Sequence, residues 1–69
     1  MPRYCVNKNA QSGTRDHEVH VWDCEHGPDE WNKLDLGNFP SCHGAMAKAK
    51  LLYPTADGCY YCSRECHTS

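Results

Sequence analysis

The chain has 69 residues, with seven Lys or Arg against nine Asp or Glu, so its formal net charge is −2. This charge gives no electrostatic attraction to nucleic acid or to an anionic membrane, and we expect weak binding to free DNA. A chain of this length forms one domain (1–69). Hydrophobic residues make up 39% of it, and the core of so short a chain contributes little stability, so a metal ion or disulfides are expected to support the fold.

Two strands are predicted near the start of the chain. Residues 3–9 (RYCVNKN) alternate large or apolar side chains with polar ones, and residues 17–22 (HEVHVW) contain β-branched and aromatic residues. Turn-forming residues around Gly13 separate the two segments, which predicts a β-hairpin with a long loop. Residues 25–33 (EHGPDEWNK) follow as a predicted loop, because the Gly-Pro pair interrupts regular structure.

One helix is predicted within residues 36–53 (LGNFPSCHGAMAKAKLLY). Ser41 is a suitable N-cap, apolar residues recur at helical spacing, and Pro54 ends the helix. Residues 55–58 (TADG) are expected to turn the chain into the cysteine-rich end, CYYCSRECHTS. The predicted architecture is therefore a small zinc-stabilised α+β domain: a β-hairpin, one helix and a C-terminal cysteine knuckle.

The spacing of Cys59 and Cys62 is the strongest sign of a metal site, because two intervening residues allow both thiolates to bind one tetrahedral ion. Zn²⁺ takes four N or S ligands, and the other compact pair of donors is His20 with Cys24, at the end of the second predicted strand. These four residues form the predicted zinc site. One His with three Cys is a ligand set of structural zinc sites, and the ion would join the hairpin to the C-terminus.

Three further donors are alternative ligands: His17, Cys66 and His67. His17 precedes His20 by three residues, so a strand would point the two imidazoles to opposite faces. Cys66 follows Cys62 by four residues, so a helical turn would let it replace His20. An all-cysteine set would also suit an iron–sulfur cluster, formed by Cys24, Cys59, Cys62 and Cys66. A second ion, if present, would be held by Cys42, His43, Cys66 and His67.

The remaining cysteines, Cys5 and Cys42, are predicted to pack as small apolar side chains. Residues 1–11 lack the apolar run of a signal peptide, and no apolar segment is long enough to cross a bilayer, so we expect a cytoplasmic protein that avoids membranes. Stable disulfides are rare in the cytoplasm, which favours metal or redox chemistry for the six cysteines over an extracellular disulfide scaffold.

The site pattern resembles that of a known zinc domain, in segments 19–24 (VHVWDC), 39–50 (FPSCHGAMAKAK) and 51–62 (LLYPTADGCYYC). The order resembles the amino-terminal zinc domain of the adaptive-response alkylphosphotriester methyltransferase, and equally the small metal-binding domains of some bacterial nucleases and competence proteins. The methyltransferase family accepts a methyl group on its first zinc cysteine. His20 stands at that position here, so the resemblance implies zinc binding and not methyl transfer.

Short stretches also resemble a family of small bacterial Cys/His-rich proteins without a known activity, namely VNKNAQ, HEVH, LGNF, DGCYYC and CHTS. The sequence shows no phosphate-binding loop and no nucleophile–base pair, and four protein ligands leave a metal no open position for catalysis. We therefore expect a non-enzymatic binding or adaptor module with a protein or nucleic-acid partner. The alternative is a thiol-redox or metal-handling protein that uses the C-terminal cysteines.

Overall fold

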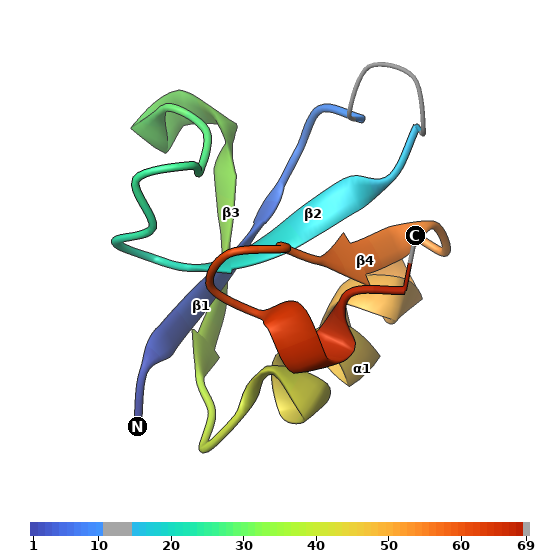
Figure 1. Cartoon of the computed structure of the whole chain (residues 1–69). Helices are drawn as coiled ribbons and strands as arrows, with labels where there is room; N and C mark the ends of the chain where they lie inside the picture. The colour runs from blue at the N-terminus through green and yellow to red at the C-terminus, as the bar shows by residue number, and fades with distance from the viewer. Residues whose placement is uncertain (11–14, 69) are drawn as a thin grey trace.

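Four strands form one mixed sheet in the computed structural model, which describes residues 1–10 and 15–68 (Figure 1). Across the sheet the order is β3 (Lys33–Asn38), β1 (Arg3–Asn7), β2 (His17–Val21) and β4 (Ala56–Gly58). β1 is antiparallel to β2 and β3, whereas β2 and β4 are parallel. The α+β class and the β1–β2 pairing confirm the prediction, while the turn expected around Gly13 lies outside the described residues.

Two strands differ from the sequence-based expectation. Residues predicted to lead into the helix form β3, in which Leu34 and Leu36 face the core on either side of Asp35. The expected turn at TADG is instead β4, which pairs with β2 in the register His17↔Ala56. The sheet therefore has four strands, where the sequence predicted a hairpin of two. β4 leads directly into the cysteine-rich end.

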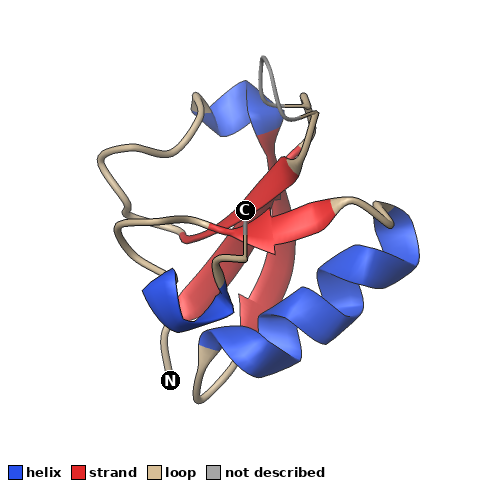
Figure 2. Ribbon diagram, turned by 45° about the vertical axis from the view of Figure 1, so that its right-hand side comes forward, coloured by secondary structure: helices blue, strands red, loops and turns tan. Residues whose placement is uncertain are grey.

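One α-helix occurs among the described residues, α1 (Cys42–Leu52), and it packs on one face of the sheet (Figure 2). Ser41 is its N-cap, as predicted, and the Ser41 hydroxyl accepts a hydrogen bond from the His43 amide at 3.3 Å. The buried side of α1 consists of Cys42, Ala45, Met46 and Ala49. These residues recur at helical spacing, and the small Ala side chains allow a close approach to the core residues of the strands.

The candidate site lies on the face of the sheet opposite to α1. Successive residues of a strand point to opposite faces, so Tyr4 and Val6 enter the core beneath α1 while Cys5 points away from it. Cys5 pairs with His20 of β2, and the two side chains are 0% and 1% exposed. The segment between β2 and β3 lies against this face, since a Cβ on Gly27 would be 3.7 Å from the His20 ring.

Candidate metal centre

Four donors converge at the end of β2: His20, Cys24, Cys59 and Cys62, whose ligand atoms all lie within 4.8 Å of one another. The Sγ atoms of Cys24 and Cys59 are 4.0 Å apart, and Cys62 Sγ is 3.8 Å from His20 Nδ1. A tetrahedral zinc ion with bonds of about 2.3 Å to S and about 2.0–2.1 Å to N would separate two sulfurs by about 3.8 Å and S from N by about 3.6 Å. These two separations match one tetrahedral ion, so the four residues could hold a metal ion.

The chain brings these donors together through the parallel contact of β2 with β4. The Cys59 amide donates to the Val19 carbonyl at 2.9 Å, which continues the ladder past the end of β4. Gly58 is required just before this point, because a Cβ there would lie 2.6 Å from the Ser63 carbonyl oxygen and 2.7 Å from Cys66 Cβ. The close return of the chain over Gly58 directs Cys59 toward the end of β2.

One backbone amide donates a hydrogen bond to each of two sulfurs. The Val21 N–H donates to Cys62 Sγ at 3.3 Å, and the Tyr61 N–H donates to Cys59 Sγ at 3.4 Å. Such donors favour negative charge on sulfur. Burial nevertheless raises the pKa of the Cys62 thiol to about 12, so a thiolate at this position requires a cation to balance its charge. The arrangement suits a sulfur bound to a metal ion.

His20 is present as the neutral imidazole that metals bind. Burial lowers its pKa to about 4, so the ring carries no charge near neutral pH. Its Nδ1 faces Cys62, while its Nε2 lies 3.5 Å from a carboxylate oxygen of Glu18. A carboxylate beyond an imidazole ligand holds the proton on the far nitrogen and orients the ring. Glu18 was not anticipated from the sequence, although its place two residues before His20 on the same strand face was a usable signal.

The alternative ligands lie outside this group of described residues. His17 is on the face of the sheet that carries α1, where its ring stacks on Tyr53 with centroids 4.0 Å apart. The His67 Nδ1 lies 3.2 Å from Asp57 Oδ2. Cys66 is bonded to another cysteine, so the structure does not bring together the four cysteines proposed for an iron–sulfur cluster. The assignment of the four ligands itself stays a prediction.

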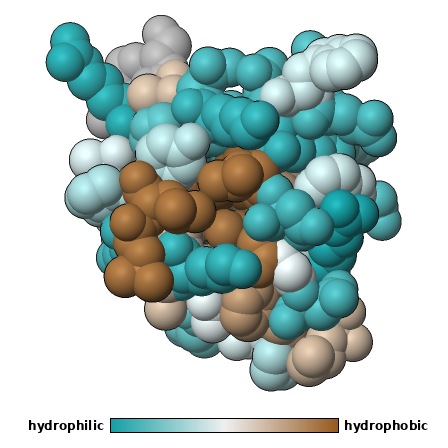
Figure 3. All heavy atoms as spheres, turned by 180° about the vertical axis from the view of Figure 1, so that it is seen from behind, coloured by the Kyte–Doolittle hydropathy of each residue, from teal (hydrophilic) through white to brown (hydrophobic). Residues whose placement is uncertain are grey.

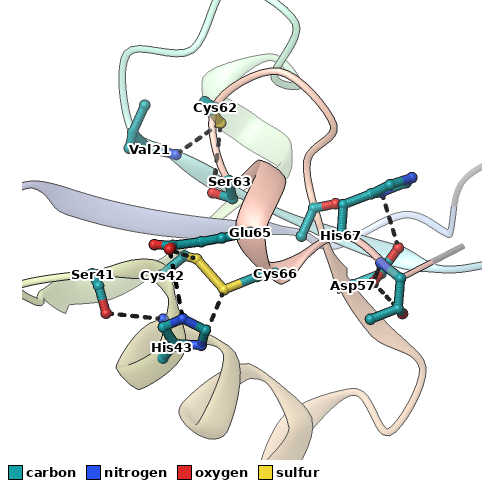
Figure 4. Close-up of a disulfide and its surroundings, with 12 residues drawn as sticks. Val21, Ser41, Cys42, His43, Asp57, Cys62, Ser63, Glu65, Cys66 and His67 are labelled. Atoms are coloured by element: carbon teal, nitrogen blue, oxygen red, sulfur yellow. Dashed lines mark hydrogen bonds and ion pairs between the residues drawn. A yellow bond between two sulfur atoms is a disulfide. The ribbon is translucent and has the colours of Figure 1, made fainter.

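A disulfide between Cys42 and Cys66 was not expected from the sequence. Cys42 is buried at the start of α1, as predicted, but it bonds to Cys66 in the short 3₁₀ helix η2 (Arg64–Cys66) (Figure 4). Six cysteines allow about 15 complete pairings, so sequence alone does not select one. The thiols of Cys5, Cys24, Cys59 and Cys62 are free.

No family model, no curated protein and no solved structure matches the chain. The fold and the site thus define a class of protein, a small α+β domain with Cys/His groups that could hold a metal ion. Within the described residues, no helix has the length and apolar character needed to span a membrane.

Proposed function

We propose that this chain is a zinc-binding protein in which the ion has a structural role. The observation that carries the proposal is the convergence of one imidazole and three thiols within 4.8 Å of one another, with one S–S separation of 4.0 Å and one S–N separation of 3.8 Å that are close to the edges of a tetrahedron. Soft thiolate and imidazole donors in this geometry favour Zn²⁺ among divalent ions. Four protein ligands close the coordination sphere, which is typical of a structural ion.

The position of the donors in the chain supports a structural role. His20 and Cys24 lie in the first half of the sequence, and Cys59 and Cys62 lie near its end. An ion bound by all four would join β2 to the C-terminal segment. The free energy of metal binding would then contribute directly to folding.

Exposed aromatic side chains support a binding or adaptor role. Tyr60 and Tyr61 lie between the two C-terminal ligands and are 46% and 66% exposed, and Trp31 is 86% exposed. Tyr and Trp are common in protein–protein interfaces, and a metal at Cys59 and Cys62 would hold both tyrosines on a rigid turn. A group of hydrophobic side chains also lies on the side of the molecule seen in Figure 3, which is opposite to the view of Figure 1. We propose a protein partner, since the net charge of −2 gives no attraction to nucleic acid.

A second candidate function is thiol-redox or metal-handling chemistry. The Cys42–Cys66 disulfide favours it, because the bond links two of the cysteines that the first site does not use. This function would operate on the α1 side of the sheet, apart from the four-donor site.

The proposed function is tested by removing either the metal or one ligand. We expect the purified chain to carry one zinc ion, and we expect a chelator or Cys62→Ser to abolish its cooperative thermal unfolding. Cys5→Ser is the matched control, because Cys5 is a buried thiol outside the ligand group; it should keep the metal and cost about 0.5–3 kcal/mol. A Cys62→Ser chain that melts like the wild type would show that the metal proposal is wrong.

A further inference from the structure

A second group of donors surrounds the disulfide on the α1 side of the sheet (Figure 4). Cys42 and His43 begin α1, while Glu65 and Cys66 belong to η2. The Nδ1 atom of His43 lies 3.6 Å from Cys66 Sγ, and a carboxylate oxygen of Glu65 lies 3.8 Å from Cys42 Sγ. Thus an imidazole and a carboxylate both approach the sulfurs, although a disulfide that only links two segments needs neither.

The same arrangement of side chains occurs at the first site. There, His20 directs Nδ1 toward a cysteine sulfur and Nε2 toward Glu18. Here, His43 directs Nδ1 toward Cys66, and its Nε2 lies 3.8 Å from Glu65 Oε2. A carboxylate behind an imidazole is the usual support of a metal-ligating histidine. The second group therefore has the donor arrangement of a metal site, except that its two sulfurs are bonded to each other.

The two groups differ in their access to solvent. The side chains of His43 and Glu65 are 67% and 66% exposed, whereas that of His20 is 1% exposed. A cavity of about 270 Å³ adjoins the second group, lined by His43, Met46, Lys50, Glu65, Cys66 and Thr68. Cys66, which is 6% exposed, is the disulfide cysteine among the residues that line this cavity, so the cavity marks the side from which a thiol or a metal ion would approach the disulfide.

We propose that the disulfide is the closed form of a redox-gated metal site, which binds one thiophilic divalent cation of the zinc class after reduction. The ligands are Cys42, Cys66 and the Nδ1 of His43. A water molecule takes the fourth position, so this site is open where the first is closed, and Glu65 supports the imidazole through Nε2. The inference does not depend on the first site, because the two groups share no ligand.

A dithiol supplies the two electrons for reduction. One of its thiolates attacks the Cys66 sulfur from the cavity, forming a mixed disulfide and releasing Cys42 as a thiolate at the start of α1, where the helix favours negative charge. The second thiol of the reductant then displaces Cys66, and the reductant leaves as its own disulfide. The two cysteine sulfurs take up protons, which are released again when the cation binds.

The test compares the zinc content of the oxidised and the reduced full-length chain. Zn²⁺ is added to the disulfide-containing protein until the first site is full, the disulfide is then reduced with a water-soluble phosphine, and more Zn²⁺ is added. We expect native mass spectrometry to show one ion before reduction and two after it. A Cys42→Ser/Cys66→Ser double variant should bind one ion under both conditions.

Two variants examine the ligand role of the imidazole. His43→Ala should weaken binding of the second ion at least about 10-fold in competition with a chelator. His26→Ala is the matched control, since the His26 side chain is 46% exposed and belongs to neither group. It should leave the affinity for the second ion unchanged.

Three results would overturn this inference: a reduced chain that still binds one ion, a His43→Ala chain that binds the second ion as tightly as the wild type, or loss of the native circular dichroism spectrum on reduction with the first ion bound. An oxidised chain that binds no zinc would instead contradict the proposed function. The difference in zinc content between reduced and oxidised chains still tests the second site in that case.

Discussion

Glu18 is the residue whose effect on the metal centre can be isolated most cleanly, because it lies behind His20 without belonging to the four donors. Glu18→Gln removes the negative charge that holds the imidazole proton on Nε2. We expect the zinc affinity to fall by about 10–100-fold, measured by competition with a chromophoric chelator.

Glu25→Gln is the control for this prediction, because it makes the same chemical change on a side chain that is 90% exposed, against 21% for Glu18. It should leave the zinc affinity unchanged. Equal affinities for the two variants would show that Glu18 does not orient His20.

The neutral state of His20 also sets the pH dependence of metal binding. Thiol ligands must lose their protons, while His20, with a pKa near 4, has none to lose at pH 7, so binding should release about three protons per ion from the disulfide-containing chain. Affinity therefore falls as the pH falls. Calorimetric titration in buffers of different ionisation enthalpy measures the proton count. A count of four would mean that another thiol has replaced His20.

The same pKa shift also makes the free energy of unfolding depend on pH. The pKa of His20 is about 4 in the folded state, below the ordinary value of 6.5, so the unfolded chain binds the additional proton first. This contribution to stability is present above about pH 6.5 and is lost as the pH falls toward 4. Mild acid should thus weaken the fold and metal binding together.

Among the secondary-structure elements, α1 and the β1–β2 hairpin were predictable because their signals are local. Ser41 marks the start of the helix and Pro54 marks its end, while large or apolar side chains alternate with polar ones in β1. β3 was missed although Leu34 and Leu36 alternate with Asp35, because the Gly-Pro pair placed residues 25–33 in a loop and residues 36–53 were assigned to the segment that carries the helix. Gly37 adopts a φ of +97°, next to the irregular register of β1 with β3.

β4 could not have been predicted from local sequence. Its three residues include Asp57 and Gly58, which are both uncommon in strands. The segment is extended because it pairs with β2, about forty positions earlier in the chain. The pairing is a tertiary interaction, and only the structure reveals it.

The Cys42–Cys66 disulfide, which joins α1 to η2, leads to a prediction about stability. Cys42→Ser removes a disulfide that closes a loop of 24 positions, so we expect the free energy of unfolding to fall by about 2–4 kcal/mol in urea denaturation of the chain with one zinc. The sequence alone treated Cys42 as a packing residue, for which the expected cost of Cys42→Ser is about 0.5–3 kcal/mol, milder than the loss of Cys59 or Cys62. Phosphine should destabilise the wild type to a similar extent and leave Cys42→Ser unaffected. If wild type and variant unfold at the same urea concentration without phosphine, the disulfide does not stabilise the fold.

At the scale of the whole molecule, the spacing in the sequence singled out the four donors, but it did not show which contact of the fold brings them together. The sequence indicated two pairs, one near His20 and one at the C-terminus. The parallel pairing of β2 with β4 brings the pairs together, with the Cys59 amide bonded to the Val19 carbonyl. The Cys42–Cys66 disulfide and the second donor group depend on the contact of η2 with α1, which no local pattern reveals.

We propose that one ion, bound by one nitrogen and three sulfurs, joins β2 to the C-terminal segment of this fold. Zinc-edge X-ray absorption of the disulfide-containing chain, loaded with one equivalent of Zn²⁺, measures the ligand set directly. We expect three sulfurs at about 2.3 Å and one nitrogen at about 2.0–2.1 Å. A coordination shell of four sulfurs, a shell of oxygen and nitrogen alone, or a chain that retains no zinc would contradict this proposal.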